Sequence, residues 1–343
     1  MKKFLKITAI IIGILAFVVM VPPLLMPSSY MASSSIVIES NPYNVFPYFA
    51  DLRTWEKWSP WKEKDTTTRY TYSEKTYGAG STMEWNSEHG LGAGKITEVQ
   101  FKKFHHINYQ LNLIKPFKIK SGGQIMVEKL NDTQVKVTWT NTRKLKWPLD
   151  RWFNTFMNFK GMMEKDFAHG LEKLKKLVES SPQKHLPVVS PEKMELPDQH
   201  IFSIMYETVR NAEISAKIGE SYGIILRTIE RTGVKKLEEP PLCLYYSHNP
   251  VTTKMRPGIM VQGCSVSLGG DVECIPIRAG KVLRFTYLGG YTTLEPMYDA
   301  IEMYLEEHKI NKRENYTWES YVTDPGTEPD SAKWLTYIYV PVK

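Results

Sequence analysis

The fold of the C-terminal half is decided by the stretch from Arg284 to Lys343, RFTYLGGYTTLEPMYDAIEMYLEEHKINKRENYTWESYVTDPGTEPDSAKWLTYIYVPVK. A short run rich in β-branched and aromatic residues leads into Gly-Gly-Tyr, which predicts a strand and a turn. Apolar residues then recur at three- and four-residue spacings, at Leu294, Tyr298, Ile301 and Leu305. This spacing predicts a helix with one apolar face. Two further strands, YTWESYVT and WLTYIYVPV, are separated by the turn residues Asp324-Pro325-Gly326, so the stretch predicts a strand, helix, strand, strand unit.

The same unit occurs twice in the sequence. Five apolar helix positions recur with a shift of 76 residues: Ile218, Tyr222, Ile225, Ile229 and Val234 correspond to Leu294, Tyr298, Ile301, Leu305 and Ile310. The segment CLYYSHNP, Cys243 to Pro250, recurs with a shift of 75 residues as WESYVTDP, Trp318 to Pro325. Two copies of a half-domain packed about a pseudo-twofold axis leave a cleft between them, which is a natural place for a ligand.

Glu319 is the acid that we expect at this cleft. Side chains alternate along a strand, so Glu319 and Tyr321 share one face. Their counterparts in the first copy are Leu244 and Tyr246, so the strand itself does not need a carboxylate at this position. If this face lines the cleft, burial raises the pKa of Glu319, and the site suits a cationic or hydrogen-bonding ligand next to tyrosine rings. The alternative is that Glu319 points to solvent.

Residues 198–343 resemble the gyrase-inhibitor-like domain, which is also the effector-binding domain of AraC-type regulators. The resemblance rests on GGY before a helix, on WESYVTDP, on the terminal YIYVPV and on the duplication. It implies a small molecule, often a lipophilic cation, bound in the cleft between the two halves. Some members of the family hydrolyse small strained electrophiles with a glutamate and aromatic residues, so a hydrolase with Glu319 as general base is a second hypothesis.

The same resemblance supplies the predicted ligand contacts. The family's E-x-Y-x-x-D-P signature matches Glu319 and Tyr321, and the tyrosine that follows its glycines matches Tyr291. We add Tyr206 and Tyr246 to this set. The sequence thus predicts a site of one carboxylate and an aromatic cage.

An apolar run from Ile7 to Met26 follows Lys2, Lys3 and Lys6 near the N-terminus. About 20 residues, at about 1.5 Å each, span the hydrocarbon core of a bilayer, so residues 1–27 are predicted to form a membrane anchor. The lysines favour the cytoplasmic side, which leaves the rest of the chain outside. A cleaved signal peptide is the alternative, and it is less favoured because no clean Ala-x-Ala site follows. A buried core helix is a third option.

Residues 28–180 are predicted to form a curved antiparallel sheet that grips a long C-terminal helix, from about Leu149 to Glu179. The segment resembles the START-like, polyketide-cyclase-like helix-grip family (SRPBCC) in ADLRTWEKWSPW, the YGAGS turn, VKVTWT and the final helix. That family includes lipid carriers, cyclases and binding modules. Its cavity would be approached by five aromatic residues, Phe49, Trp55, Trp58, Trp61 and Trp85. The alternative is that these rings are core, and a lipid-like ligand in this cavity is a further expectation.

Three cysteines, Cys243, Cys264 and Cys274, lie in the C-terminal half. Cys264 and Cys274 can pair in an oxidising compartment, but the favoured interpretation is that all three are small core residues. The histidines show no spacing typical of a metal site, and the sequence predicts no metal and no cofactor.

The formal net charge of +7 is concentrated near the anchor. Residues 28–180 carry 23 basic and 16 acidic side chains, and residues 181–343 carry 18 and 21. The excess could attract anionic lipid headgroups, or it could be a solvated lysine-rich surface. No helix-turn-helix pattern, zinc ligand set or arginine cluster occurs, so nucleic acid is not an expected partner.

The sequence therefore predicts an α+β protein with an anchor, a helix-grip domain (28–180), a proline-rich linker (181–197) and an effector-binding domain (198–343). The leading hypothesis is a membrane-anchored, extracytoplasmic protein that binds a small amphipathic or cationic molecule. The alternatives are the hydrolase and an interaction protein that couples ligand occupancy to a membrane partner.

Overall fold

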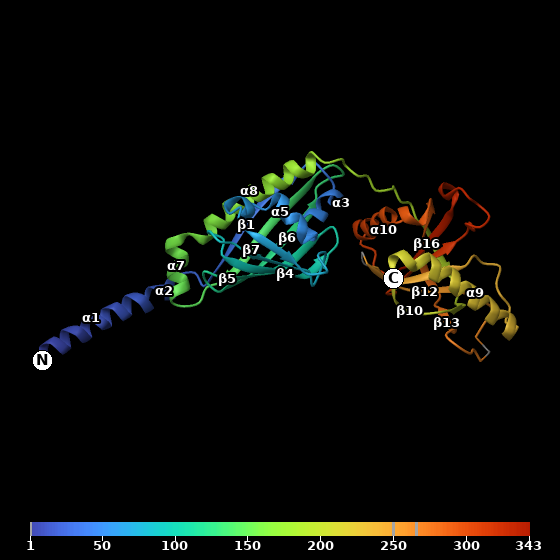
Figure 1. Cartoon of the computed structure of the whole chain (residues 1–343), viewed down its shortest axis with the longest axis horizontal. Helices are drawn as coiled ribbons and strands as arrows, with labels where there is room; N and C mark the ends of the chain where they lie inside the picture. Colours follow the sequence, from blue (N-terminus) through green and yellow to red (C-terminus); the bar gives the residue numbers. More distant parts are fainter. Residues whose placement is uncertain (1, 249–250, 265–266) are drawn as a thin grey trace. The chain divides into compact units, whose positions relative to one another are not determined.

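The computed structural model describes residues 2–248, 251–264 and 267–343. The chain divides into two compact units, Met1–His185 and Leu186–Lys343 (Figure 1). Asn249 and Pro250, the last residues of the CLYYSHNP motif, lie outside the described residues.

The first unit begins with the apolar helix α1 (Lys2–Met20) and the short helix α2 (Pro22–Leu25). Residues Phe4–Leu25 are long and apolar enough to cross a membrane, and none of this stretch is buried against the protein. A signal sequence near the N-terminus has the same length and composition. The change of helix falls at the Pro22-Pro23 pair, since a proline fits the first turn of a new helix but not the interior of one.

A seven-stranded antiparallel sheet follows, with the order β1-β7-β6-β5-β4-β3-β2. Its strands are β1 (Ser29–Ile38), β2 (Arg69–Tyr72), β3 (Thr82–Asn86), β4 (Ala93–Lys102), β5 (His106–Lys115), β6 (Ile119–Lys129) and β7 (Val135–Lys144). Short helices connect β1 to β2: α3 (Pro42–Val45), α4 (Pro47–Ala50), η1 (Leu52–Thr54), α5 (Trp55–Trp58) and α6 (Trp61–Lys64). Along β7 every second side chain is buried, which gives the sheet one inner face.

Helix α8 (Phe159–Glu179) packs on this sheet and buries one face, with Phe167, Gly170, Leu171, Leu174 and Val178. The helix-grip architecture is therefore confirmed. The single closing helix predicted from Leu149 is instead divided, because Asn158 adopts a left-handed conformation (φ 46°, ψ 49°) between α7 (Leu149–Met157) and α8. The Asn158 side chain accepts a hydrogen bond from the Gly161 amide and caps α8.

The second unit is built on a nine-stranded antiparallel sheet with the order β13-β9-β12-β11-β15-β16-β14-β8, and β10 pairs with β12. The strands are β8 (Glu192–Leu196), β9 (Gln199–Ser203), β10 (Tyr206–Arg210), β11 (Leu242–His248), β12 (Thr252–Val261), β13 (Glu273–Ile277), β14 (Gly280–Leu288), β15 (Thr317–Tyr321) and β16 (Leu335–Pro341). The helical elements are η2 (Asn211–Glu213), α9 (Ile214–Thr232), η3 (Tyr291–Thr293), α10 (Glu295–Glu307) and η4 (Ser331–Lys333).

The strand, helix, strand, strand order predicted for residues 284–343 is present as β14, α10, β15 and β16. Helix α10 buries Met297, Ile301 and Leu305 against Phe285 and Ile338 of the sheet. Helix α9 likewise packs against β9 and β12. The twofold relation between the two copies stays a prediction.

The predicted linker differs from the structure at its C-terminal end. Residues Glu192–Leu196 form β8, which pairs with β14 from Leu196 opposite Gly280 to Glu192 opposite Arg284. The alternating sequence EKMEL supplies an edge strand, so these residues belong to the sheet of the second unit.

Candidate functional site

The structure places Glu319 in the middle of the second unit's sheet. Strand β15 lies between β11 and β16, and Glu319 stands opposite Cys243 on one side and Ile338 on the other. Only 4% of the Glu319 surface is exposed. A carboxyl group in this position has lost its hydration shell, so its hydrogen-bond partners decide whether it can carry a charge.

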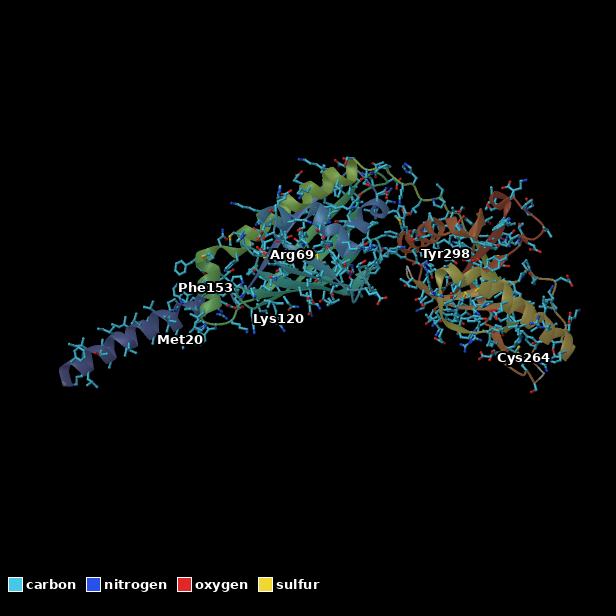
Figure 2. All side chains as sticks on the ribbon, in the orientation of Figure 1. Met20, Arg69, Lys120, Phe153, Cys264 and Tyr298 are labelled. Atoms are coloured by element: carbon cyan, nitrogen blue, oxygen red, sulfur yellow. A yellow bond between two sulfur atoms is a disulfide. The ribbon has the colours of Figure 1, made fainter. Side chains whose placement is uncertain are left out.

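Tyrosine hydroxyls supply those partners. Tyr298 on α10 donates a hydrogen bond to Oε1 of Glu319 (2.7 Å), and Tyr321 on β15 donates one to Oε2 (2.8 Å). The Tyr321 hydroxyl also lies 2.8 Å from the hydroxyl of Tyr245 on β11. Figure 2 labels Tyr298 within the second unit. Both carboxylate oxygens are therefore held by phenol donors that come from a helix and a strand.

The electrostatic balance at this cluster has one main cause. Burial raises the pKa of Glu319, and the hydroxyls of Tyr298, Tyr321 and Tyr245 oppose this shift because they donate to the charged form. Burial, followed by the charge of Glu319, also raises the pKa of Tyr298 and Tyr321 well above its usual value. The tyrosines keep their protons and stay donors, and the acid is the group that can change charge.

Half-buried aromatic rings border the cluster. Tyr291, in the 3-10 turn after the two glycines, has its ring centroid 5.4 Å from that of Tyr321 and 5.0 Å from that of Trp334. Burial and the charge of Glu319 raise the pKa of Tyr291 to about 12. Tyr206 packs against the same small apolar cluster as Tyr321 and Tyr245, and its hydroxyl lies 3.0 Å from Oγ of Ser221. Four of the predicted contacts, Glu319, Tyr321, Tyr291 and Tyr206, are thus brought together.

Tyr246 lies on the opposite face of the sheet. It packs against the core cluster that contains Leu244 and Trp318, and its ring centroid is 5.5 Å from that of Tyr316. The residues on the face of Glu319 are Cys243 and Tyr245, which precede Glu319 and Tyr321 by 76 residues each. The shift of 75 used for the strands was therefore one residue out of step with the alternation of faces.

The sequence contained a signal for the residues that were missed. The helices recur with a shift of 76, and the same shift applied to the strands gives Tyr245 as the counterpart of Tyr321. It also pairs Tyr298 with Tyr222 of α9, whose hydroxyl donates to the backbone oxygen of Leu242 (3.0 Å). Burial first, then Cys243 and Glu319, raises the pKa of Tyr222.

In the first unit, the aromatic residues predicted for a cavity form the core. Phe49, Trp55 and Trp58 have at most 1% of their surface exposed. The rings of Trp55, Trp58 and Trp61 pack around Trp139, which stacks on Phe167 of α8 at 4.2 Å. Trp85 stands apart on β3, over Gly94, where a Cβ atom would come within 2.3 Å of its ring. The lipid-like ligand expected in this domain stays a prediction.

The first unit also contains a buried acid that sequence reasoning missed. Glu98 on β4 has no exposed surface, and neither of its carboxylate oxygens has a hydrogen-bond partner among the described residues. Burial raises the pKa of Glu98 to about 8; Ser81 and the Gly78 amide lower it by less, and Asp51 adds to the increase. A polar residue in an otherwise alternating strand carries no sequence signal that would tell an inward from an outward glutamate.

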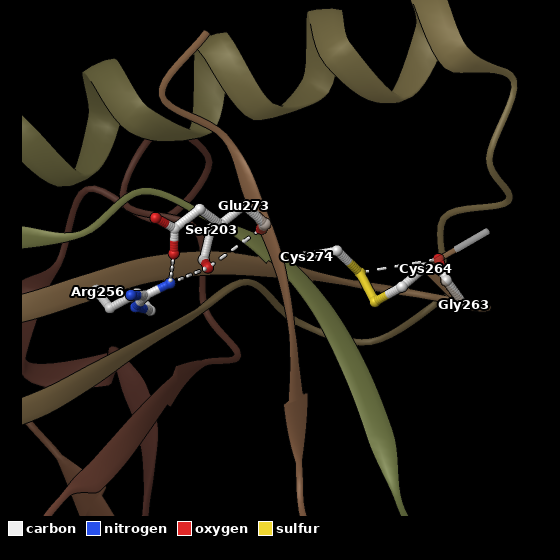
Figure 3. Close-up of a disulfide and its surroundings, with 6 residues drawn as sticks. All are labelled: Ser203, Arg256, Gly263, Cys264, Glu273 and Cys274. Atoms are coloured by element: carbon white, nitrogen blue, oxygen red, sulfur yellow. Dashed lines mark hydrogen bonds and ion pairs between the residues drawn. A yellow bond between two sulfur atoms is a disulfide. The ribbon is translucent and has the colours of Figure 1, made fainter. Parts of the chain in front are cut away.

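Cys264 and Cys274 form a disulfide, with their Cα atoms 5.7 Å apart (Figure 3). The favoured interpretation of three core cysteines is wrong for this pair and holds for Cys243, which is free and buried. The bond ties the segment after β12 to β13, next to the pair between Arg256 Nη1 and Glu273 Oε2 (2.7 Å). Among the described residues, no cluster of three or more His, Cys, Asp and Glu side chains could hold a metal ion.

Two classes of small-molecule-binding domain are joined in this chain. Residues 31–179 match the family model described as polyketide cyclase / dehydrase and lipid transport. Residues 190–343 match the family model of the GyrI-like small molecule binding domain. The first unit is therefore a polyketide-cyclase-like domain, and the second is a GyrI-like domain.

Among solved structures, a cryo-EM structure of an EcmrR–DNA complex is 19% identical, with 56% of this chain and 70% of that chain covered and a TM-score of 0.42. The EcmrR C-terminal domain is 18% identical, with 46% and 99% covered and a TM-score of 0.40. A hydrolase from Listeria innocua is 13% identical, with 50% and 98% covered and a TM-score of 0.33. The comparison with curated proteins found no match. Our expectation that this chain binds no nucleic acid stays a prediction.

Proposed function

We propose that the GyrI-like domain binds a small amphipathic cation, with Glu319 as its counter-ion. The observation that supports this most strongly is the carboxylate itself: it is 4% exposed, and both its oxygens accept hydrogen bonds from tyrosines. A buried carboxylate is costly unless it is paired, and a bound cation supplies the missing charge. Neutral phenol donors orient the carboxylate but leave its charge available.

The aromatic border supports the amphipathic character of the ligand. Tyr291, Trp334 and Tyr206 present ring surface next to the acid. Ring faces attract cations and also cover apolar groups. A ligand with a delocalised positive charge and aryl or alkyl groups satisfies both surfaces, whereas a strongly hydrated inorganic cation satisfies only one of them.

The experiment is a thermal-shift series on the full chain in lipid nanodiscs, with tetraphenylphosphonium as the cation and triphenylphosphine oxide as its neutral analogue. The wild type should be stabilised by the cation and little by the neutral compound. Glu319→Gln should lose the cation response, while Glu98→Gln, a matched change at the buried glutamate of the other unit, should keep it. An equal cation shift in Glu319→Gln would contradict charge recognition.

The same variants distinguish binding from catalysis. If the wild type turns over an electrophilic ester that Glu319→Gln binds but does not cleave, the hydrolase hypothesis replaces the binding hypothesis. Binding of the cation without turnover leaves the domain as a binding module.

We further propose that residues 1–27 anchor the protein in a membrane and that both domains lie outside the cytoplasm. The apolar stretch Phe4–Leu25 has the length of a membrane span, and lysines precede it. The Cys264–Cys274 disulfide supports the outside location because such bonds persist in oxidising compartments. Acid trapping of cells, followed by a thiol-specific mass label, should show this pair oxidised; two free thiols in untreated cells would contradict the location.

A further inference from the structure

Helix α7 (Leu149–Met157) directs its apolar side chains away from the protein. None of its residues is buried. Its large apolar side chains have more than half of their surface exposed: Leu149 59%, Phe153 56%, Phe156 76% and Met157 54%. They recur at spacings of three and four residues, so they form one face of the helix. A helix on the surface of a domain in water normally directs this face to the core.

The polar side chains of α7 face inward instead. Asp150 pairs with Arg143 of β7 (2.9 Å), and Arg143 is only 8% exposed. Arg151 donates from Nη1 to the backbone oxygen of Pro23 (2.8 Å). Asn154 turns its amide oxygen into the protein, where it is buried. The amphipathic pattern of α7 is therefore reversed relative to a helix that faces water.

This helix is tied to the end of the apolar N-terminal helix. Trp147 donates from Nε1 to the backbone oxygen of Met20, and Trp152 donates to that of Val19, both at 3.1 Å. Figure 2 shows Met20 and Phe153 at the same end of the first unit. Tryptophans at the end of a membrane span mark the interface between hydrocarbon and water, because the ring is apolar and its N–H is polar.

The turn between β5 and β6 lies at the same end of the sheet. Leu113 pairs with Ile119 beside this turn, and the register continues through Gly122 opposite Thr142 to Ser29 opposite Lys144, which follows the anchor. The turn exposes Ile114 (51%) and Phe117 (68%). Two apolar side chains at the tip of a turn have no core to contact.

Basic residues surround these apolar side chains. Residues 113–120 and 143–147 contain five exposed lysines, Lys115, Lys118, Lys120, Lys144 and Lys146, and no acidic residue. Beside α7, a polar-lined cavity of about 470 Å³ is bordered by Tyr30, Asn154 and Lys160. Apolar side chains within a ring of lysines complement a bilayer with anionic headgroups, in which acyl chains lie under negative charge.

We propose that α7 and the tip of the β5–β6 turn form a lipid-facing surface, which docks the polyketide-cyclase-like domain onto an anionic bilayer next to the anchor. The apolar face of α7 and Phe117 enter the interface, and the lysines contact headgroups. The domain is then held against the membrane by a surface as well as by a tether. This inference rests on the proposed anchor, and the test separates the two.

The test uses the full chain in nanodiscs with brominated acyl chains, which quench nearby tryptophans. Phe156→Trp and Phe117→Trp each add a reporter to the lipid-facing surface. Leu130→Trp adds one at the opposite end of the sheet, on a side chain that is also exposed (46%). Each variant is compared with the wild type in discs with and without bromine, and in discs with zwitterionic or anionic headgroups.

We expect the added emission of Phe156→Trp and Phe117→Trp to be quenched by at least about half, and more in anionic discs, because both side chains reach the interface. The added emission of Leu130→Trp should be unaffected. If the chain assembles with the discs but neither reporter is quenched more than Leu130→Trp, docking is overturned and the anchor stands. If the chain does not assemble with the discs, the anchor is wrong and the docking falls with it.

Discussion

Glu98 and Glu319 are both buried in a sheet, one in each unit, and they differ in what surrounds the carboxyl group. Glu319 accepts hydrogen bonds from Tyr298 and Tyr321, while the carboxylate oxygens of Glu98 have no hydrogen-bond partner among the described residues. Burial raises the pKa of both groups. Only at Glu319 do donors stand ready to stabilise the charged form.

This difference separates a structural acid from a site. A buried carboxyl group without donors avoids its desolvation cost by keeping its proton, and Glu98 then behaves as a neutral polar residue of the core. A carboxyl group held by phenol donors is oriented, and it needs only a positive charge to ionise inside the protein. Four changes sharpen or break this contrast.

The largest effect is expected for the pH dependence of stability at Glu98. Its pKa of about 8 lies above its ordinary value of 4.5, so the folded state holds a proton that the unfolded state releases. The stabilisation is complete below pH 4.5 and is lost as the pH rises through about 8. Relative to Glu98→Gln, the wild type should lose on the order of a few kcal/mol across this range. Parallel pH profiles in denaturant melts followed by tryptophan emission would show that Glu98 is not protonated in the fold.

The next effect is on affinity at Glu319. Glu319→Gln should weaken binding of tetraphenylphosphonium by about tenfold or more, which is about 1.4 kcal/mol. Wild-type affinity should increase with pH, because the raised pKa leaves the carboxyl group partly neutral at low pH, and the variant should show no such increase. Equilibrium dialysis across a pH series measures both, and Glu98→Gln should match the wild type.

A smaller effect is expected when one donor is removed. Tyr298→Phe and Tyr321→Phe each take away one hydrogen bond to the carboxylate and should raise the pKa of Glu319 further. Cation affinity at neutral pH should fall by about threefold to tenfold. Tyr246→Phe is the matched control, because Tyr246 lies on the other face of the sheet. An equal loss in this control would mean that the effect is on stability and not on the site.

The smallest effect belongs to the aromatic border. Tyr291→Leu keeps an apolar side chain next to Tyr321 and Trp334 but removes the ring face. The loss of one cation–π contact should reduce cation affinity by about twofold to fivefold. Binding of the neutral analogue should change less, and a larger loss for the neutral compound would assign Tyr291 to shape and not to charge.

The sequence was sufficient for both folds and for the central acid. The apolar spacing from Leu294 to Leu305 predicted the helix of the last unit, and the alternation around Glu319 predicted its burial, because both patterns repeat with the geometry of the element. Tyr298 was read only as a helix-face residue, since spacing shows the side of a helix but not the polar group that the side chain reaches.

Other features depend on single backbone positions or on distant contacts. The break at Asn158 needs a left-handed residue, which asparagine permits but does not require. The bulge after Tyr245 shifts the register of β11, so a motif alignment alone assigned Tyr246 to the wrong face. The Cys264–Cys274 pair depends on how the chain returns along β13, which spacing does not reveal.

The most direct test of the central claim is the number of protons released when the cation binds, measured calorimetrically in buffers with different heats of ionisation. At a pH below the raised pKa of Glu319, the wild type and Glu98→Gln should release a proton as the carboxyl group ionises against the cation. Glu319→Gln should release none. Equal proton release in Glu319→Gln and the wild type would show that Glu319 is not the counter-ion of the bound cation.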